Sequence, residues 1–599
     1  MIYHCEDHTC NYWDEGEKLP ERCPQCGRKL LRANEADMTG DDWTALGNTL
    51  WDAEASDKKR MVDCFRKAAY LGSAWGVCNL GICMEQGNGV EADPVQAFWL
   101  YQQAVEMGSL NAVCCLGVCY QYGIGTAPDA KQAAELYCKA AEYGSPRGQM
   151  LLARAFHDGI GVEADAAEAV HWVRAAAYQR YGEGMYRLGV CYEYGDGVEQ
   201  NWEHAVHWFR EAAESGVSAA MTDLGYCYEK GCGVEQSWEQ AFSWYRRGAE
   251  CGNPVSMSNL GLCYQMGYGV EQNWQEAIKW YEQGAQCGDL QSMHNLARCY
   301  ERGEGVEQNE DRALYWYRRS AEGGNGDAMC NLGRCYERGY GVEQNWQEAV
   351  KWYEQGAQCG NLQSMHNLAC CYERGEGVEQ NMTEAIRWYT AAAEGGNADD
   401  MYELGWQYDH GEGVEQDMKK AICWYERAAE QNYPAAMNSL GECYAMGRGV
   451  PRDLETAMEW YRRAAELGEA MADYNMGWHL EQAGKLSEAY AHYRKAADGN
   501  DDSAWWALGR FYENGVVVAQ DGKEARRCYE TGEKLGSVKC KMRLARCKLL
   551  GIGGRRAKKA GLDLCRQALE LAKESSEKED YGYEAEMNLL RRTIAENES

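Results

Sequence analysis

Apolar and small residues recur along almost the whole chain with a period of 36 residues. One instance begins with Leu260 and Gly261, and Gly or Ala returns at the position of Gly261 in steps of 36. The positions in phase are Gly81, Gly117, Ala153, Gly189, Gly225, Gly261, Ala297, Gly333, Ala369, Gly405, Gly441 and Gly477, and those slightly out of phase are Gly47, Gly509 and Ala545. The repeat predicts an array of about fifteen units with atypical ends.

Each unit carries two helical patterns. In the first pattern of one unit, Met257, Leu260 and Tyr264 fall on a single face; in the second pattern, Ala277 and Tyr281 do. These spacings follow the 3.6-residue period of an amphipathic helix. A unit of this kind is predicted to form a hairpin of two antiparallel helices.

Polar and glycine residues mark the ends of the predicted helices. Asn273, followed three residues later by Glu276, is typical of a helix N-cap with a capping-box partner. Gly267 and Gly269, in a Gly-x-Gly-Val segment, stand where the first helix must end. The boundaries of each hairpin are therefore encoded locally.

The combination of Leu-Gly-x-x-Tyr, Gly-x-Gly-Val, a polar N-cap and Ala-x-x-Trp-Tyr-x-x-Ala-Ala-x-x-Gly resembles the Sel-one-like repeat (SLR) family over residues 43–560. The resemblance implies a right-handed superhelix of antiparallel helix pairs, related to tetratricopeptide arrays, that serves as an adaptor or scaffold for protein complexes. The expected fold is therefore an all-α, right-handed superhelical α/α solenoid. A small module at residues 1–42 would precede it, and a helical cap at residues 561–599 would follow it.

A long internal duplication indicates binding in preference to catalysis. Residues 271–309 and 343–381 differ at only three aligned positions, namely Ile278/Val350, Asp289/Asn361 and Arg298/Cys370. A unique active site gains nothing from being copied, whereas an extended binding surface gains length. We therefore expect a non-catalytic scaffold.

Three consecutive units carry an Asn and an Arg seven residues apart on the first helix. The pairs are Asn295 and Arg302, Asn331 and Arg338, and Asn367 and Arg374. Seven residues make two helical turns, so both side chains project from one face. In SLR and tetratricopeptide relatives the first helices line the concave groove, where the amides would bind the backbone of an extended segment and the guanidinium groups its carboxylates.

The alternative for this ladder is a solvated face. Glu301, Glu337 and Glu373 each neighbour one of the arginines and would form weak, exposed ion pairs with them. If the ladder does bind, the expected partner is a protein or an extended peptide with acidic residues. Which face of the solenoid is used stays open at this point.

Four cysteines near the N-terminus predict a structural zinc site. Cys5, Cys10, Cys23 and Cys26 stand as C-x(4)-C and C-x(2)-C, and the second knuckle resembles that of a zinc ribbon. The first knuckle departs from the common two-residue spacing and leaves room for His4 or His8 to replace one cysteine ligand. A site closed by four protein ligands would fold a segment that lacks a sufficient core.

Charge and hydropathy narrow the classes of partner. The 599 residues include 93 Asp and Glu against 61 Lys and Arg, a formal net charge of −32 that repels nucleic acid and anionic membranes. We find neither a secretory signal nor an apolar run long enough to span a membrane. The 29 cysteines indicate reduced thiols used as small buried hydrophobes. We therefore expect a soluble, cytoplasmic monomer.

Two other function classes stay open as alternatives. A hydrolase on the repeat scaffold would need a buried, perturbed acid or nucleophile that breaks the repeat in one unit, and the sequence alone does not reveal one. A nucleic-acid adaptor would use the zinc ribbon and the short basic run at residues 555–559. Steeply salt-dependent retention on DNA or RNA would favour that second class.

Overall fold

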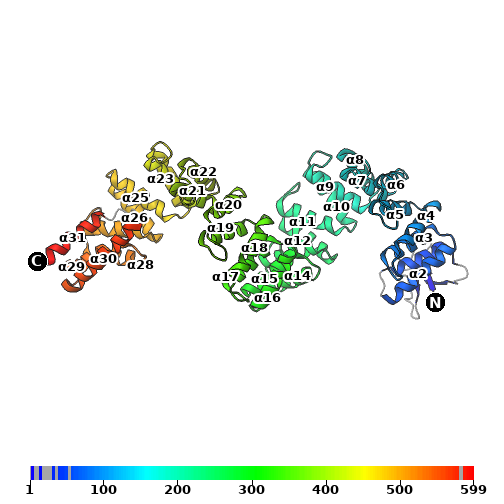
Figure 1. Ribbon diagram of the computed structural model, residues 1–599, viewed down its shortest axis with the longest axis horizontal. Coiled ribbons are helices and arrows are strands. Elements are labelled where there is room, and N and C mark those ends of the chain that lie inside the picture. The colour runs from blue at the N-terminus through cyan, green and yellow to red at the C-terminus, as the bar shows by residue number, and fades with distance from the viewer. Residues whose placement is uncertain are drawn as a thin grey trace. The chain divides into compact units, whose positions relative to one another are not determined.

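The computed structural model describes residues 2–5, 13–15, 30–33, 38–51, 55–578 and 584–598 (Figure 1). It forms two compact units, Met1–Asn309 and Glu310–Ser599, called here the N-terminal and C-terminal units. Their boundary falls inside the stretch predicted as one solenoid.

A small antiparallel sheet begins the N-terminal unit. Its strands are β1 (Ile2–Cys5), β2 (Trp13–Glu15) and β3 (Leu30–Ala33), in the order β2-β1-β3. Ile2 of β1 pairs with Glu15 on one side and with Ala33 on the other. The expected all-α character therefore holds for the repeat region and not for this segment.

All other described elements are helices. Those of the N-terminal unit are α1 (Gly40–Thr49), α2 (Ala55–Tyr70), α3 (Ala74–Gln86), α4 (Pro94–Glu106), α5 (Leu110–Tyr122), α6 (Ala130–Glu142), α7 (Pro146–Asp158), α8 (Ala166–Tyr178), α9 (Gly182–Tyr194), α10 (Trp202–Glu214), α11 (Ser218–Lys230), α12 (Trp238–Glu250), α13 (Pro254–Met266), α14 (Trp274–Gln286) and α15 (Leu290–Arg302). Those of the C-terminal unit are α16 (Glu310–Glu322), α17 (Gly326–Arg338), α18 (Trp346–Gln358), α19 (Leu362–Arg374), α20 (Met382–Glu394), α21 (Ala398–His410), α22 (Met418–Glu430), α23 (Pro434–Met446), α24 (Leu454–Glu466), α25 (Ala470–Gln482), α26 (Leu486–Asp498), α27 (Asp502–Asn514), α28 (Gly522–Lys534), α29 (Val538–Leu550), α30 (Lys558–Lys578) and α31 (Glu584–Glu598).

Consecutive helices pack as hairpins, which confirms the predicted α/α solenoid. Pairs run from α1/α2 to α13/α14 in the N-terminal unit and from α17/α18 to α29/α30 in the C-terminal unit. Helices α15 and α16, expected to form one more hairpin, stand on either side of the boundary between the units. The handedness of the superhelix stays a prediction.

The core of most hairpins is built on a small anchor residue, Gly or Ala, and a buried aromatic ring. A Cβ added to Gly261 would lie 2.5 Å from the ring of Tyr281, so the missing side chain lets the ring pack against the first helix. The Tyr281 hydroxyl donates a hydrogen bond of 2.8 Å to Gln265 near the end of that helix. Where the glycine is replaced by Ala153, the facing aromatic is replaced by Val173, and both are buried.

The predicted N-cap and helix stop are confirmed, but the Glu276 side chain bonds to Lys279 and does not complete a capping box. The Asn273 side chain accepts a hydrogen bond from the backbone N–H of Glu276 and caps α14. Gly267 ends α13 in the left-handed conformation, with a φ of 76°. A Cβ on Gly269 would lie 2.2 Å from the carbonyl oxygen of Trp238 at the start of α12. The glycine pair therefore ends one helix and seats the loop on the preceding hairpin.

In most units a cysteine stands two residues after the anchor, where it is a packing residue. Cys83, Cys263 and Cys443 are all buried, each exposing 2% of its surface or less. Burial raises the pKa of the Cys263 thiol to about 12. A buried thiol with a raised pKa is a small hydrophobe and not a reactive group.

First helices of successive hairpins contact one another directly. Contacts of this kind join α1 to α3, α5 to α7 and α13 to α15 in the N-terminal unit, and α17 to α19 and α27 to α29 in the C-terminal unit. The side on which like helices approach closely is the inner side of a curved stack. We call the surface formed by the odd-numbered helices α17 to α29 the first-helix face; Arg338, Arg374, Met446 and Trp478 are exposed on it.

Candidate partner-binding face

The three ladder arginines occupy equivalent places at helix ends. Arg302, Arg338 and Arg374 are the last residues of α15, α17 and α19, directly before glycines that end each helix. All three are exposed, and a cation there also interacts favourably with the helix dipole. Arg302 lies 3.9 Å from Glu304. Within the described part of the chain, Arg338 and Arg374 have no ion-pair partner.

The three ladder asparagines are engaged inside the protein. Asn295 is buried and accepts a hydrogen bond of 3.1 Å from Gln291. Asn331 is half-buried and accepts one of 3.2 Å from Arg334 on the same helix. Asn367, also half-buried, donates to the sulfur of Cys330 on α17 at 3.5 Å. Asn367 thus links two first helices, whereas the bonds of Asn295 and Asn331 lie within their own helices. The arginines are the exposed part of the ladder.

The glutamates beside two of the arginines are held by tyrosines. The Tyr353 hydroxyl donates to Glu337 at 2.5 Å, and the Tyr389 hydroxyl donates to Glu373 at 2.9 Å. This bond joins the last turn of a first helix to the core of its own hairpin. Glu337 and Glu373 therefore have partners other than the neighbouring arginines.

A pocket of about 420 Å³ opens on the same face of the C-terminal unit. It is lined by Glu442, Met446, Arg448, Tyr461, Tyr474, Asn475, Trp478 and His479. Met446 stands four repeats after Arg302 and Asn475 five repeats after Asn295, so the pocket occupies the ladder's own repeat positions. Trp478 and Met446 are exposed at its edge.

A departure from the repeat accompanies the pocket. In other hairpins an acidic or amide side chain accepts from the buried tyrosine 16 residues later, as Glu229 does from Tyr245. The residue 16 before Tyr461 is Ala445. Tyr461 is fully buried, and its ring stacks on His479 with the ring centroids 6.0 Å apart. This hairpin therefore lacks the carboxylate or amide that accepts from the buried tyrosine in other hairpins.

The polar wall of the pocket holds a carboxylate, Glu442, and a guanidinium, Arg448. Arg448 binds the buried carboxylate of Asp409 at 2.9 Å and lies 3.9 Å from Glu442. Asn438 and Asn475 donate to Glu442 at 3.1 and 3.2 Å. Desolvation raises the pKa of the Glu442 carboxyl. Two carboxylates thus share one guanidinium, and the wall favours a side chain that donates hydrogen bonds.

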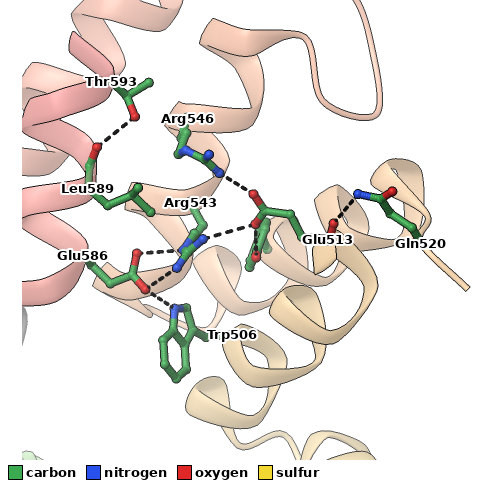
Figure 2. Close-up of polar contacts among 9 residues, drawn as sticks. Trp506, Glu513, Gln520, Arg543, Arg546, Glu586, Leu589 and Thr593 are labelled. Carbon is green, nitrogen blue, oxygen red and sulfur yellow. Dashed lines mark hydrogen bonds and ion pairs between the residues drawn. The ribbon is translucent and has the colours of Figure 1, made fainter. Parts of the chain in front are cut away.

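At the C-terminal end, the chain's own last helix covers part of the first-helix face (Figure 2). Helix α31 packs on α29 and α30, with Met587 and Leu590 in their apolar cluster. Glu586 of α31 contacts two nitrogens of Arg543 on α29, both at 2.7 Å, and accepts from the Trp506 indole on α27 at 3.3 Å. One acidic residue thereby joins α31 to two successive first helices.

The same network continues into α27. Arg543 lies 3.3 Å from Glu513, which also binds Arg546. The Tyr529 hydroxyl donates to Glu513 at 2.7 Å. Figure 2 shows Arg543 between the two glutamates. The carboxylates of Glu513 and Glu586 are at most 9% exposed, so both charges depend on these partners.

The predicted zinc ligands lie outside what the structure describes. Cys10, Cys23, Cys26 and His8 are not among the described residues. Only the backbone of Cys5 and His4 is described, within β1. Among the described side chains, no group of three or more His, Cys, Asp and Glu is arranged to hold a metal ion.

The sequence predicted a helical cap at residues 561–599, but neither the pocket nor the contacts by which α31 docks. The signal for the pocket was Ala445, which breaks a series of acidic or amide residues in the same repeat position. Helix α31 carries no repeat signature, and its contact with Trp506 joins residues 80 positions apart. No local pattern predicts such a contact.

The stacked helical hairpins, with polar side chains hydrogen-bonded between and within them, place the chain in the class of helical-repeat proteins with a scaffold fold. The chain belongs to the Sel1 repeat family, which matches residues 76–109, 112–145, 146–181, 182–217, 218–253, 254–289, 290–325, 326–361, 362–397, 398–433, 434–469, 470–501 and 504–537. This confirms the resemblance drawn from the sequence. No curated protein matches the chain.

One solved structure supports this assignment, and a second is similar in sequence. The chain is 32% identical to c5321, a protective antigen present in uropathogenic Escherichia coli strains that displays an SLR fold; the match covers 75% of this chain and 97% of that one, with a TM-score of 0.51. A Sel1 repeat protein from Oxalobacter formigenes is 33% identical over 41% of this chain and 96% of its own, with a TM-score of 0.38. None of the described helices is long and apolar enough to cross a membrane.

Proposed function

We propose that the protein is a non-catalytic scaffold that binds acidic segments of partner proteins on its first-helix face. The observation that carries the proposal is the docking of α31, whose Glu586 is bound by Arg543 and Trp506. The chain thus supplies one example of an acidic helix held there. Membership of the Sel1 repeat family, whose solenoids bind proteins, supports the same function.

The open part of the face offers similar chemistry. Exposed Arg338 and Arg374 would pair with carboxylates of the partner, as Arg543 pairs with Glu586. Arg302, in the N-terminal unit, has the same place at its helix end. The pocket beside Trp478 would take a hydrogen-bond-donating side chain of the partner against Glu442. A partner segment would then combine acidic residues with one basic anchor.

Affinity capture from source-cell lysate, with partners identified by mass spectrometry, tests this function. The bait would be the full-length protein beside a variant with Arg302, Arg338 and Arg374 all changed to Glu. The matched control changes Arg246, Arg387 and Arg462 to Glu, which are similarly exposed but lie on the second helices α12, α20 and α24.

We expect partners to be retained by the wild type and by the control variant and to be lost by the ladder variant. Circular dichroism would establish that the three proteins fold equally. Equal retention by the ladder variant would contradict the role of these arginines. Loss from both variants would show that only total charge matters.

We also propose a structural zinc ion at Cys5, Cys10, Cys23 and Cys26, on the grounds of their spacing alone. The ion would stabilise the segment around the small sheet. Metal analysis of the purified full-length protein should find one zinc per chain, and none after Cys23 and Cys26 are changed to Ser. Separate His4→Ala and His8→Ala variants would reveal whether a histidine replaces one cysteine. Purified protein that holds no zinc, and in which Cys5, Cys10, Cys23 and Cys26 are all open to alkylation, would contradict the site.

A further inference from the structure

Helices α19 and α21 place a histidine ring in contact with a cysteine on one side and an aspartate on the other. The sulfur of Cys370 lies 3.6 Å from Nε2 of His366, one helical turn earlier on α19. Nδ1 of the same ring lies 2.7 Å from Oδ1 of Asp400 on α21. The imidazole therefore stands between a thiol and a carboxylate and contacts each with a different nitrogen.

The three groups differ in their access to solvent. Asp400 is fully buried, and its second oxygen, Oδ2, has no hydrogen-bond partner among the described residues. The His366 side chain is 30% exposed, and Cys370 is half-buried. A buried carboxylate thus orients a ring whose other side, with the thiol, is reachable from solvent.

This arrangement breaks the repeat in one unit. The duplicated segment keeps the histidine as His294, but Arg298 stands where Cys370 does. The counterpart of Asp400 two repeats earlier is Ala328. Neither the thiol nor the carboxylate is therefore repeated around His294.

The electrostatics favour a charged ring. The hydrogen bond to Asp400, followed by that to Cys370, raises the pKa of His366 to about 10. Burial raises the pKa of the Asp400 carboxyl, and the bond to His366 opposes that rise. An imidazolium donates from Nδ1 to the carboxylate and from Nε2 to the sulfur.

A tyrosine and a second carboxylate also lie near the thiol and the ring. The Tyr389 hydroxyl of α20 lies 3.4 Å from the Cys370 sulfur and donates its proton to Glu373, so its oxygen is able to accept the thiol proton. Glu403 of α21 also interacts with His366 and Asp400. The thiol therefore lies among an imidazole, a phenol hydroxyl and nearby carboxylates.

We propose that Cys370 is an activated thiol, oriented by His366 and Asp400, that forms a mixed disulfide with small disulfides. The Cys370 thiolate attacks one sulfur of the disulfide; a new S–S bond forms, the old one breaks, and the released thiolate takes the proton from His366. The surrounding carboxylates favour a cationic disulfide. This chemistry does not depend on partner binding at the first-helix face.

The decisive experiment measures reaction rates at individual cysteines of the reduced full-length protein. Iodoacetamide is the probe for thiolate, and peptide mass spectrometry follows Cys370 beside the exposed Cys287 and Cys423 in the same sample. At pH 6 we expect Cys370 to react at least about tenfold faster than the two exposed cysteines, because ordinary thiols are almost fully protonated there. A rate at Cys370 that is no faster would overturn the proposal.

Variants assign the roles within the group. His366→Asn and Asp400→Asn should each slow the reaction of Cys370 at pH 6 about tenfold. Arg298→Cys is the matched control, because it places a cysteine beside His294 without an aspartate at position 328. The new cysteine at position 298 should react at the rate of Cys287. If it reacted as fast as Cys370, Asp400 would not be needed to activate the thiol.

Cystamine, a cationic disulfide, tests the exchange itself. We expect the mass of one cysteamine group on Cys370 before either exposed cysteine is modified, and its removal by a reducing agent. Fast alkylation without this adduct would overturn the mixed disulfide. Because the wild-type protein carries its own reference cysteines, the result does not depend on whether a variant folds.

Discussion

Two stretches of the C-terminal unit present the same first-helix face in different states. At α27 and α29 the face is covered by α31, and its arginine and tryptophan are bound to Glu586. From α17 to α25 the face is uncovered by any described helix, and Arg338, Arg374 and Trp478 are exposed. This difference indicates that the surface holds an acidic helix where one is attached and is available where none is.

The largest expected effect is at the covered end. Arg543→Ala would leave Glu586 and part of Glu513 buried without their guanidinium partner, at a cost of about 3–5 kcal/mol. We expect α31 to detach, so that amide hydrogen exchange of residues 584–598 becomes fast while α17 to α25 keep their protection. Protection of α31 unchanged in the variant would contradict the assigned role of this network.

A smaller loss of stability is expected at His366, in the uncovered stretch, and unlike the loss at Arg543 it should depend on pH. His366→Ala removes the cation that pairs with buried Asp400, for which we expect a loss of about 2–3 kcal/mol at pH 6. The folded pKa of His366 is raised to about 10, so the pair's contribution is fully present below about 6.5 and is lost as pH rises through 10. The difference in urea stability between wild type and variant should therefore shrink towards pH 10.

The covered end supplies the control for that measurement. Arg543 keeps its charge throughout this range, because a guanidinium does not lose its proton below about pH 12. The destabilisation by Arg543→Ala should therefore stay constant from about pH 6 to pH 10. A His366 effect that is also constant would contradict the assigned protonation of the ring.

A substitution beside the pocket, Ala445→Glu, should increase the free energy of unfolding by about 1 kcal/mol. Ala445→Glu would restore the hydrogen-bond acceptor that other hairpins place opposite the buried tyrosine, here Tyr461. The added side chain would also fill space beside His479 and reduce binding of any partner that uses the pocket. Thermal unfolding and partner capture with this variant test both parts; unchanged binding would exclude the pocket from the interface.

The smallest effect concerns the exposed arginines. Arg338→Glu and Arg374→Glu should each change the free energy of unfolding by less than about 0.5 kcal/mol, because neither has an ion-pair partner among the described residues. Urea denaturation measures this directly. A loss of several kcal/mol would show that these side chains support the fold, and they would then resemble Arg543.

The repeat made most of the fold predictable. The anchor at Gly261, the cap at Asn273 and the stop at Gly267 are local signals, and the structure confirms each of them. The ladder was placed on the correct helices, but burial of Asn295 and the internal bonds of Asn367 depend on neighbouring hairpins. Such contacts join repeats and have no signature within one repeat.

The cluster of Cys370, His366 and Asp400 depends on residues that depart from the repeat pattern. Cys370 is one of only three differences within the duplication. Its proposed activation also requires Asp400, which lies outside the duplicated segment. The two residues meet only when α19 packs beside α21. The hydrolase alternative required a perturbed group in one unit, and the sequence did not reveal this one.

We expect partners to bind the open first-helix face, and photo-crosslinking in source cells is a direct test of this binding. A benzoylphenylalanine would replace Met446, exposed at the pocket, or Arg387, exposed on the second helix α20. We expect discrete protein adducts from position 446 and none from position 387. Adducts from position 387 with none from position 446 would contradict the claim.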